Sequence, residues 1–170
     1  MKIDNCKSNF SALATKILPG YMKSMRAAMK KSHQMADFCD SGKGVKAILD
    51  SLEHKKDFSG CYVFLKEKTP FYVGISRRLV GRLHQHGVAE THFGASLAYL
   101  MASQKMPHKM KRDEAMADPK FRKVFDRARS RIRKSSVAFI EIENQLELYL
   151  FEPYCAMKLG TGEWNTFKTH

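Results

Sequence analysis

The pattern of apolar and polar positions predicts a short strand hairpin near the middle of the chain. Residues 61–65 and residues 71–75 are two runs rich in β-branched and aromatic side chains, which is typical of strands. The polar residues 66–69 separate the two runs. A third apolar run predicts a further strand over residues 137–142.

Helical spacing of apolar side chains surrounds these strands. In residues 8–31 apolar side chains recur at the spacing of a helix face, and Pro19 with Gly20 is expected to interrupt the run. Pro153 is expected to stop or kink the last helix, because proline lacks the amide hydrogen that a helix interior needs. Further helices are expected over residues 45–52, 77–86, 94–101, 118–134 and 145–151. Ser76 is the expected N-cap of the second of these helices, and Gly87 lies just past its expected end.

The length of the chain bounds its organisation. A chain of 170 residues forms one domain, or a small core with an extension, and it can bury a core without disulfides or metals. We interpret residues 1–57 as a helical N-terminal extension that packs on the core. Residues 58–170 then form the main domain, with a basic helical insert at about residues 91–134.

The charge of the chain narrows the choice of partner. Thirty lysines and arginines stand against 17 acidic residues, a formal net charge of +13. This excess predicts a polyanionic partner, with nucleic acid the first candidate and an anionic membrane the second. The excess is concentrated in residues 1–34, with seven basic residues and one acidic residue, and in residues 105–134, with twelve and four.

Cysteine usage and hydropathy bear on location. The four cysteines are scattered without a Cys-x-x-Cys pair, which favours reduced structural thiols in a cytosolic protein. No apolar run approaches the length of a membrane span, and the first residues lack the apolar stretch of a signal peptide. A cytoplasmic location and no membrane association are therefore expected.

Residues suited to phosphodiester chemistry occur on and after the hairpin. Each hairpin strand carries one tyrosine, Tyr62 or Tyr72, and Arg78, Arg82 and His86 follow at intervals of four on one face of the expected helix. An arginine fork matches phosphate geometry, whereas a phenol is a poor base unless a neighbouring cation favours its phenolate. Together these side chains suggest a site that holds and cuts a phosphodiester.

Such a site needs a proton acceptor for water and a positive charge at the phosphate, both of which a divalent cation can supply. Magnesium takes only one or two carboxylates from the protein. Glu147 is a candidate for the single carboxylate because it lies in an otherwise apolar helix. Glu143 and Glu152 are rival carboxylates.

These residues also occur in a recognisable order. The chain resembles the GIY-YIG nuclease superfamily over about residues 58–168, excluding the basic insert. The residues that carry this resemblance are Gly60-Cys61-Tyr62, Tyr72-Val73-Gly74, Arg82, His86, Glu147 and Asn165. Cys61 and Val73 replace the isoleucines of the family pattern, which changes packing and no chemistry.

The resemblance implies an α/β (α+β) fold with a small three-stranded antiparallel sheet flanked by helices. It also implies cleavage of DNA with Mg²⁺, or with Mn²⁺ as a substitute. In the roles that it implies, Glu147 binds the metal, Tyr62 is the general base and Arg82 contacts the scissile phosphate. Tyr72 and His86 orient these groups, and Asn165 supports the site from the end of the chain.

Contacts with the phosphate backbone of DNA are expected mainly from the basic helix. The residues expected to make them are Arg78, Arg127, Arg129, Arg131, Arg133 and Lys134.

The sequence thus predicts a divalent-metal-dependent endonuclease acting on double-stranded DNA. A basic insert on a short chain looks most like the restriction or defence type. A homodimer is expected if the enzyme cuts both strands at one sequence. Two alternatives stay open: a structure-specific or relaxed nuclease acting on branched or single-stranded DNA or RNA, and a non-catalytic nucleic-acid-binding module.

Overall fold

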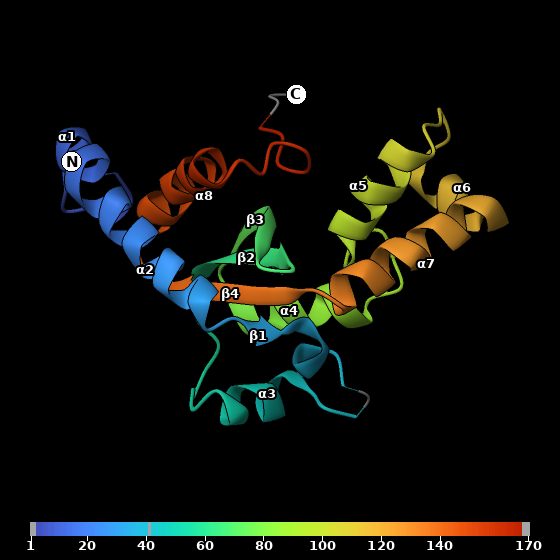
Figure 1. Cartoon of the computed structure of the whole chain (residues 1–170), viewed down its shortest axis with the longest axis horizontal. Coiled ribbons are helices and arrows are strands. Elements are labelled where there is room, and N and C mark those ends of the chain that lie inside the picture. The colour runs from blue at the N-terminus through green and yellow to red at the C-terminus, as the bar shows by residue number, and fades with distance from the viewer. Residues whose placement is uncertain (1–2, 41, 168–170) are drawn as a thin grey trace. The chain divides into compact units, whose positions relative to one another are not determined.

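The computed structural model describes residues 3–40 and 42–167 of the chain (Figure 1). The chain divides into two units, which are described separately. Unit 1 contains Met1–His33, Asp57–Leu79 and Ser136–His170, and unit 2 contains Gln34–Lys56 and Val80–Ser135. The chain returns to unit 1 at Asp57, whereas the domain boundary was expected after residue 57. The first 56 residues, however, are themselves shared between the units.

Unit 1 is built on an antiparallel sheet, which confirms the expected α+β fold. Its strands are β1 (His33–Gln34, of which Gln34 is counted in unit 2), β2 (Gly60–Lys66), β3 (Thr69–Ser76) and β4 (Ser136–Glu141). Their order in the sheet is β1-β4-β2-β3, so β2 pairs with both β3 and β4. Three strands were expected, and the two-residue β1 adds a fourth in the described part of the chain.

The hairpin between β2 and β3 is tighter than expected. Lys66 pairs with Thr69, so only Glu67 and Lys68 form the loop. Both loop residues have positive φ, 50° and 71°, as a two-residue type I′ turn requires. Neither residue is glycine or asparagine, so the turn carried no recognisable signal in the sequence.

One face of the sheet packs on two helices of unit 1. The side chains of Cys61, Val63 and Leu65 belong to one core cluster with residues of two helices, α2 (Leu18–Lys30) and α8 (Gln145–Leu159). In unit 1, α2 packs on β4 and α8 packs on β3 (Figure 1). Because side chains alternate along a strand, Tyr62 and Phe64 point to the opposite face.

Two prolines expected to break helices lie inside them. Pro19 is in the first turn of α2, where no amide hydrogen is needed. Before it come η1 (Ile3–Asn5), α1 (Phe10–Ala12) and the π-helical segment η2 (Leu13–Ile17), so the helical path is continuous from Phe10. Helix α8 continues past Pro153, and buried side chains occur both before and after the proline. The helix ends at Gly160, which adopts the left-handed conformation.

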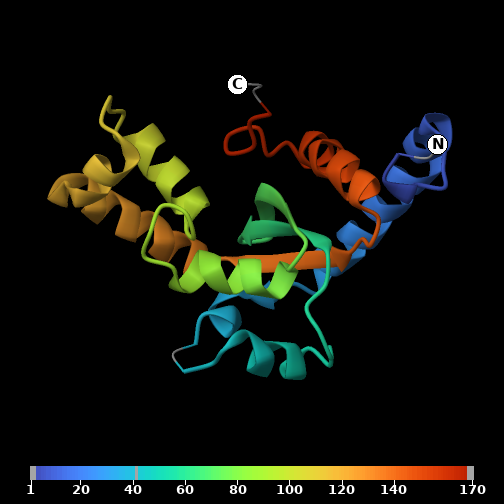
Figure 2. The same cartoon turned by 180° about the vertical axis from the view of Figure 1, so that it is seen from behind.

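Unit 2 is helical. Its elements are η3 (Met35–Phe38), α3 (Val45–Ser51), α4 (Leu79–Val88, from Val80 on), α5 (Ser96–Lys105), α6 (Arg112–Ala117) and α7 (Pro119–Arg133). Helices α5 and α6 pack on α7 (Figure 2). The Asp118 side chain accepts a hydrogen bond from the Phe121 amide at 2.7 Å and caps α7. The expected basic helix over residues 118–134 is therefore confirmed.

The helix after the hairpin begins and ends later than expected. The Ser76 side chain accepts a hydrogen bond from the Arg78 amide in a turn, and α4 begins only at Leu79. Gly87 lies inside the helix and does not end it. A Cβ atom there would stand 1.7 Å from Sγ of Cys39, so Gly87 permits close packing within unit 2.

Candidate functional site

Tyr62 lies across the backbone of the neighbouring strand in unit 1. It is directly opposite Gly74 in the register of β2 and β3. A Cβ atom on Gly74 would stand 2.5 Å from both Cζ and Oη of Tyr62, so only glycine leaves room for the phenol. The ring is 1% exposed, and its centroid lies 6.2 Å from that of Tyr72. The two predicted tyrosines therefore come together on one face of the sheet.

Asn165 is attached to the edge strand of the same sheet. Its Oδ1 accepts a hydrogen bond from the Val73 amide at 2.9 Å, and its Nδ2 donates to the Val73 carbonyl at 2.7 Å. Because β3 is the last strand in the sheet order, these are backbone groups that another strand would otherwise pair. The Asn165 amide donates to the Thr161 carbonyl at 3.0 Å, which holds the segment after α8 in place.

Glu147 lies in the first turn of α8, where its amide donates to Oδ1 of the N-cap residue Asn144 at 3.1 Å. One carboxylate oxygen accepts a hydrogen bond from Oη of Tyr21 at 2.5 Å, and the other lies 3.7 Å from Sγ of Cys6. Burial, and after it the bond to Glu147, raises the pKa of Tyr21. The Glu147 carboxylate is thus engaged by the N-terminal segment and α2.

Glu152 lies on a different side of the same helix. Glu152 is four residues from Leu148 and from Ala156, so it shares a helix face with these two buried residues. Glu147 instead shares a face with Phe151, whose ring contacts Tyr21. Burial raises the pKa of Glu152 to about 7, and no cation contributes to that value. Burial, then Cys155, then Glu152 raise the pKa of Cys61 in β2. Glu152 is therefore a largely buried carboxyl group that holds its proton more tightly than an exposed carboxyl does.

Arg82 and His86 both belong to unit 2. Arg82 donates to the Gly94 carbonyl at 3.0 Å and to Oγ of Ser96 at 2.6 Å, so it joins α4 to the segment that leads into α5. His86 is fully buried, and burial followed by the charge of Arg82 lowers its pKa well below the usual range. The imidazole of His86 is therefore neutral at neutral pH.

The six predicted site residues are thus divided between the units. Tyr62, Tyr72, Glu147 and Asn165 belong to unit 1, and Arg82 and His86 belong to unit 2. Within unit 1 the structure joins Tyr62, Tyr72 and Asn165 through β2 and β3. It places the Glu147 carboxylate against Tyr21 on α2. From the sequence, Glu152 was only an alternative to Glu147 as the carboxylate of the site. The sequence signal that distinguishes the two is spacing: Glu152 is four residues after the buried Leu148 and so shares its helix face, whereas Glu147 does not.

Most of the predicted DNA-binding residues are exposed. Arg78 precedes α4 and is exposed, and so are Arg127, Arg131, Arg133 and Lys134. Arg129 differs, because its side chain is 13% exposed, donates to the Val88 carbonyl at 3.1 Å and pairs with Asp126 at 3.3 Å. Its guanidinium also lies 5.8 Å from the centre of the Phe125 ring. The structure therefore gives Arg129 a packing role within unit 2.

No protein-family model, curated protein or solved structure matches this chain. Among residues 3–40 and 42–167, no three or more His, Cys, Asp or Glu side chains gather in a group that could hold a metal ion. Within the same residues, none of the helices has the length and apolar character to cross a bilayer.

Proposed function

We propose that the chain is a metal-dependent endonuclease of the GIY-YIG type that hydrolyses DNA phosphodiester bonds, as a restriction or defence enzyme of the cytoplasm. The observation that carries this proposal is the convergence of Tyr62, Tyr72 and Asn165 on strand β3. Tyr62 and Tyr72 come from one hairpin and Asn165 from the segment after α8, and Gly74 leaves the space that Tyr62 needs.

The carboxylates of α8 fit a Mg²⁺ ion held by a single protein ligand, with Mn²⁺ as a substitute, because water and substrate can fill the remaining positions. Glu152 is the proposed ligand, because Tyr21 already binds the Glu147 carboxylate whereas burial alone accounts for the raised pKa of Glu152. A bound ion would neutralise the phosphate and activate water. In this proposal Glu152 takes the role that the resemblance gives to Glu147.

The other residues of unit 1 contribute position and proton transfer. Tyr62 is the proposed proton acceptor, and the strand pair fixes its hydroxyl over Gly74. Tyr72, half-buried beside it, orients it, while Asn165 holds the edge of β3. The roles that the resemblance gives to Arg82 and His86 stay predictions.

The charge pattern of α7 supports DNA as the substrate. One side of this helix carries exposed cations at intervals of three and four residues: Lys120, Lys123, Arg127, Arg131 and Lys134. At 1.5 Å per residue this stripe is roughly 21 Å long. A row of that length suits the backbone of a nucleic acid better than it suits a single anion.

The proposal is tested by incubating purified protein with supercoiled plasmid in Mg²⁺, Mn²⁺ or EDTA. We expect nicked or linear product only with a metal. Tyr62→Phe should slow cleavage by roughly 10²- to 10⁴-fold, the range of general acid–base effects. Glu152→Gln should abolish cleavage, Glu147→Gln should retain it, and all three variants should still bind DNA.

Two results would change this assignment. Loss of cleavage in Glu147→Gln with normal cleavage in Glu152→Gln would return the metal role to Glu147. If duplex, branched and single-stranded DNA and RNA are all bound but none gives a metal-dependent product, the chain is a non-catalytic binding module.

A further inference from the structure

Unit 1 contains a basic groove between α2 and α8, of about 640 Å³. Five cations line it: Lys23, Arg26, Lys30, Lys31 and Lys158. Tyr154 lines it as well, and the Lys158 ammonium lies 5.6 Å from the centre of the Tyr154 ring. No acidic residue is among the residues that line this α2–α8 groove.

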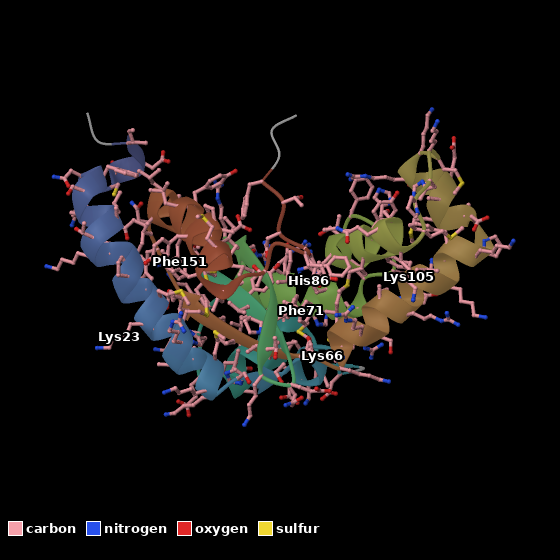
Figure 3. The ribbon with its side chains drawn as sticks, turned by 45° about the horizontal axis from the view of Figure 1, so that its top comes forward. Lys23, Lys66, Phe71, His86, Lys105 and Phe151 are labelled. Atoms are coloured by element: carbon pink, nitrogen blue, oxygen red, sulfur yellow. The ribbon has the colours of Figure 1, made fainter. Side chains whose placement is uncertain are left out.

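The sequence of α2 builds one wall of this groove. Lys23, Arg26 and Lys30 follow at intervals of three and four residues, so they share one face of the helix and span roughly 10 Å. All three are exposed, and Lys23 projects outward from α2 in Figure 3. The apolar face of the same helix, with Met22 and Met25, is buried in the core of unit 1.

The positive charges of the groove are not neutralised by the protein. In the part of the chain that the structure describes, no carboxylate lies within 4.0 Å of any of the five cations. Residues 5–36 contain no aspartate or glutamate at all. Like charges held this close repel one another, so an anion in the groove would stabilise it.

We propose that the α2–α8 groove binds the phosphodiester backbone of duplex DNA. The cations form a row along a helix, which matches a chain of phosphates better than a single phosphate. An anionic membrane fits less well, because the apolar face of α2 is already buried and cannot insert into a bilayer. This inference rests on the proposed function for the identity of DNA as the ligand, and it adds a contact surface that is separate from the α7 stripe.

The electrostatics of DNA binding set the size of the expected effect. Each phosphate contact contributes about 0.9 to the slope of log affinity against log salt. Loss of one contact should lower affinity roughly 8-fold at about 0.1 M salt, and loss of three contacts roughly 500-fold. The slope should fall by about 0.9 to 2.7 in parallel.

The test measures binding of a fluorescent 20-base-pair duplex by anisotropy across a salt series, in EDTA so that no cleavage occurs. The groove variant is Lys23→Gln, Arg26→Gln and Lys30→Gln combined. The matched control removes three exposed lysines of unit 2, Lys46, Lys55 and Lys56, and so makes the same change in net charge. We expect the groove variant to lose at least about 8-fold in affinity with a smaller salt slope, and the control to keep its slope.

Two outcomes would overturn the inference. One is a groove variant whose affinity and salt slope equal those of the control. The other is unchanged DNA binding with lost binding to phosphatidylserine vesicles, which would assign the groove to a membrane. Unaltered thermal unfolding of the exposed-residue variants shows that the fold is intact. Because binding is measured without metal, a chain that binds DNA through the groove but never cleaves it would refute only the nuclease proposal.

Discussion

Asn165→Ala is the most direct test of how the end of the chain supports the sheet. The substitution removes both hydrogen bonds that the side chain makes to Val73, at 2.9 Å and 2.7 Å. A protein hydrogen bond contributes about 0.5–1.5 kcal/mol net, so the loss of two should destabilise the fold by about 1–3 kcal/mol. For a protein of this size each kcal/mol lowers Tm by roughly 2–4 °C, which predicts a fall of about 2–12 °C.

Asn165→Asp separates the two bonds. A carboxylate can still accept from the Val73 amide, but it places an oxygen against the Val73 carbonyl and has no hydrogen to donate. At neutral pH this variant should be at least as unstable as Asn165→Ala. It should regain stability in acid, where the protonated carboxyl can donate.

The assay is thermal unfolding followed by circular dichroism, together with hydrogen exchange at the Val73 amide. Thr166→Ala is the matched control, because Thr166 is the next residue and is exposed. The reasoning is refuted if Asn165→Ala unfolds within about 0.5 kcal/mol of Thr166→Ala, the usual range for surface substitutions. Unchanged exchange at Val73 would refute it as well.

Three further predictions concern unit 1. Gly74→Ala should destabilise the fold by about 1–3 kcal/mol, since the new Cβ would meet the ring of Tyr62. Measured by urea unfolding, this loss of stability should vanish in a Tyr62→Ala background. A loss that persists there would contradict the contact. Folding raises the pKa of Glu152 from 4.5 to about 7, so the folded state holds the proton more tightly and stability should fall as pH rises through that window. Glu152→Gln should flatten this part of the stability–pH curve, and a curve of unchanged slope would count against the burial of the carboxyl. Tyr21→Phe removes a 2.5 Å hydrogen bond to a carboxylate and should cost about 1.5–3 kcal/mol in chemical denaturation, whereas a variant as stable as the parent would show that the bond to Glu147 contributes nothing.

Features with local signals could be predicted well. The hairpin strands were recognisable from β-branched and aromatic runs, and α7 from the helical spacing of its apolar side chains. These signals lie within a few residues of the element that they specify. The resemblance implied the α+β class, and the structure confirms it.

Helix ends were harder to predict, because tertiary packing overrides local preference. Pro153 was expected to stop or kink α8, yet the helix continues past it to Leu159, and Phe151, Cys155 and Ala156 are buried on the two sides of the proline. Gly87 was expected just past the end of the helix, yet it lies inside α4, where Cys39 packs against its backbone. Neither contact is visible from neighbouring residues in the sequence.

Residue types and their order along the chain could be known before folding: two tyrosines, an arginine, a histidine, a carboxylate helix and a closing asparagine, with a large excess of positive charge. The fold alone settled which carboxylate of α8 is engaged by Tyr21, which arginine of α7 packs inward, and which lysines of α2 share a groove with α8. The physical reason is that composition and local periodicity act along the chain. Burial, pairing and charge compensation instead depend on side chains that come together only in three dimensions.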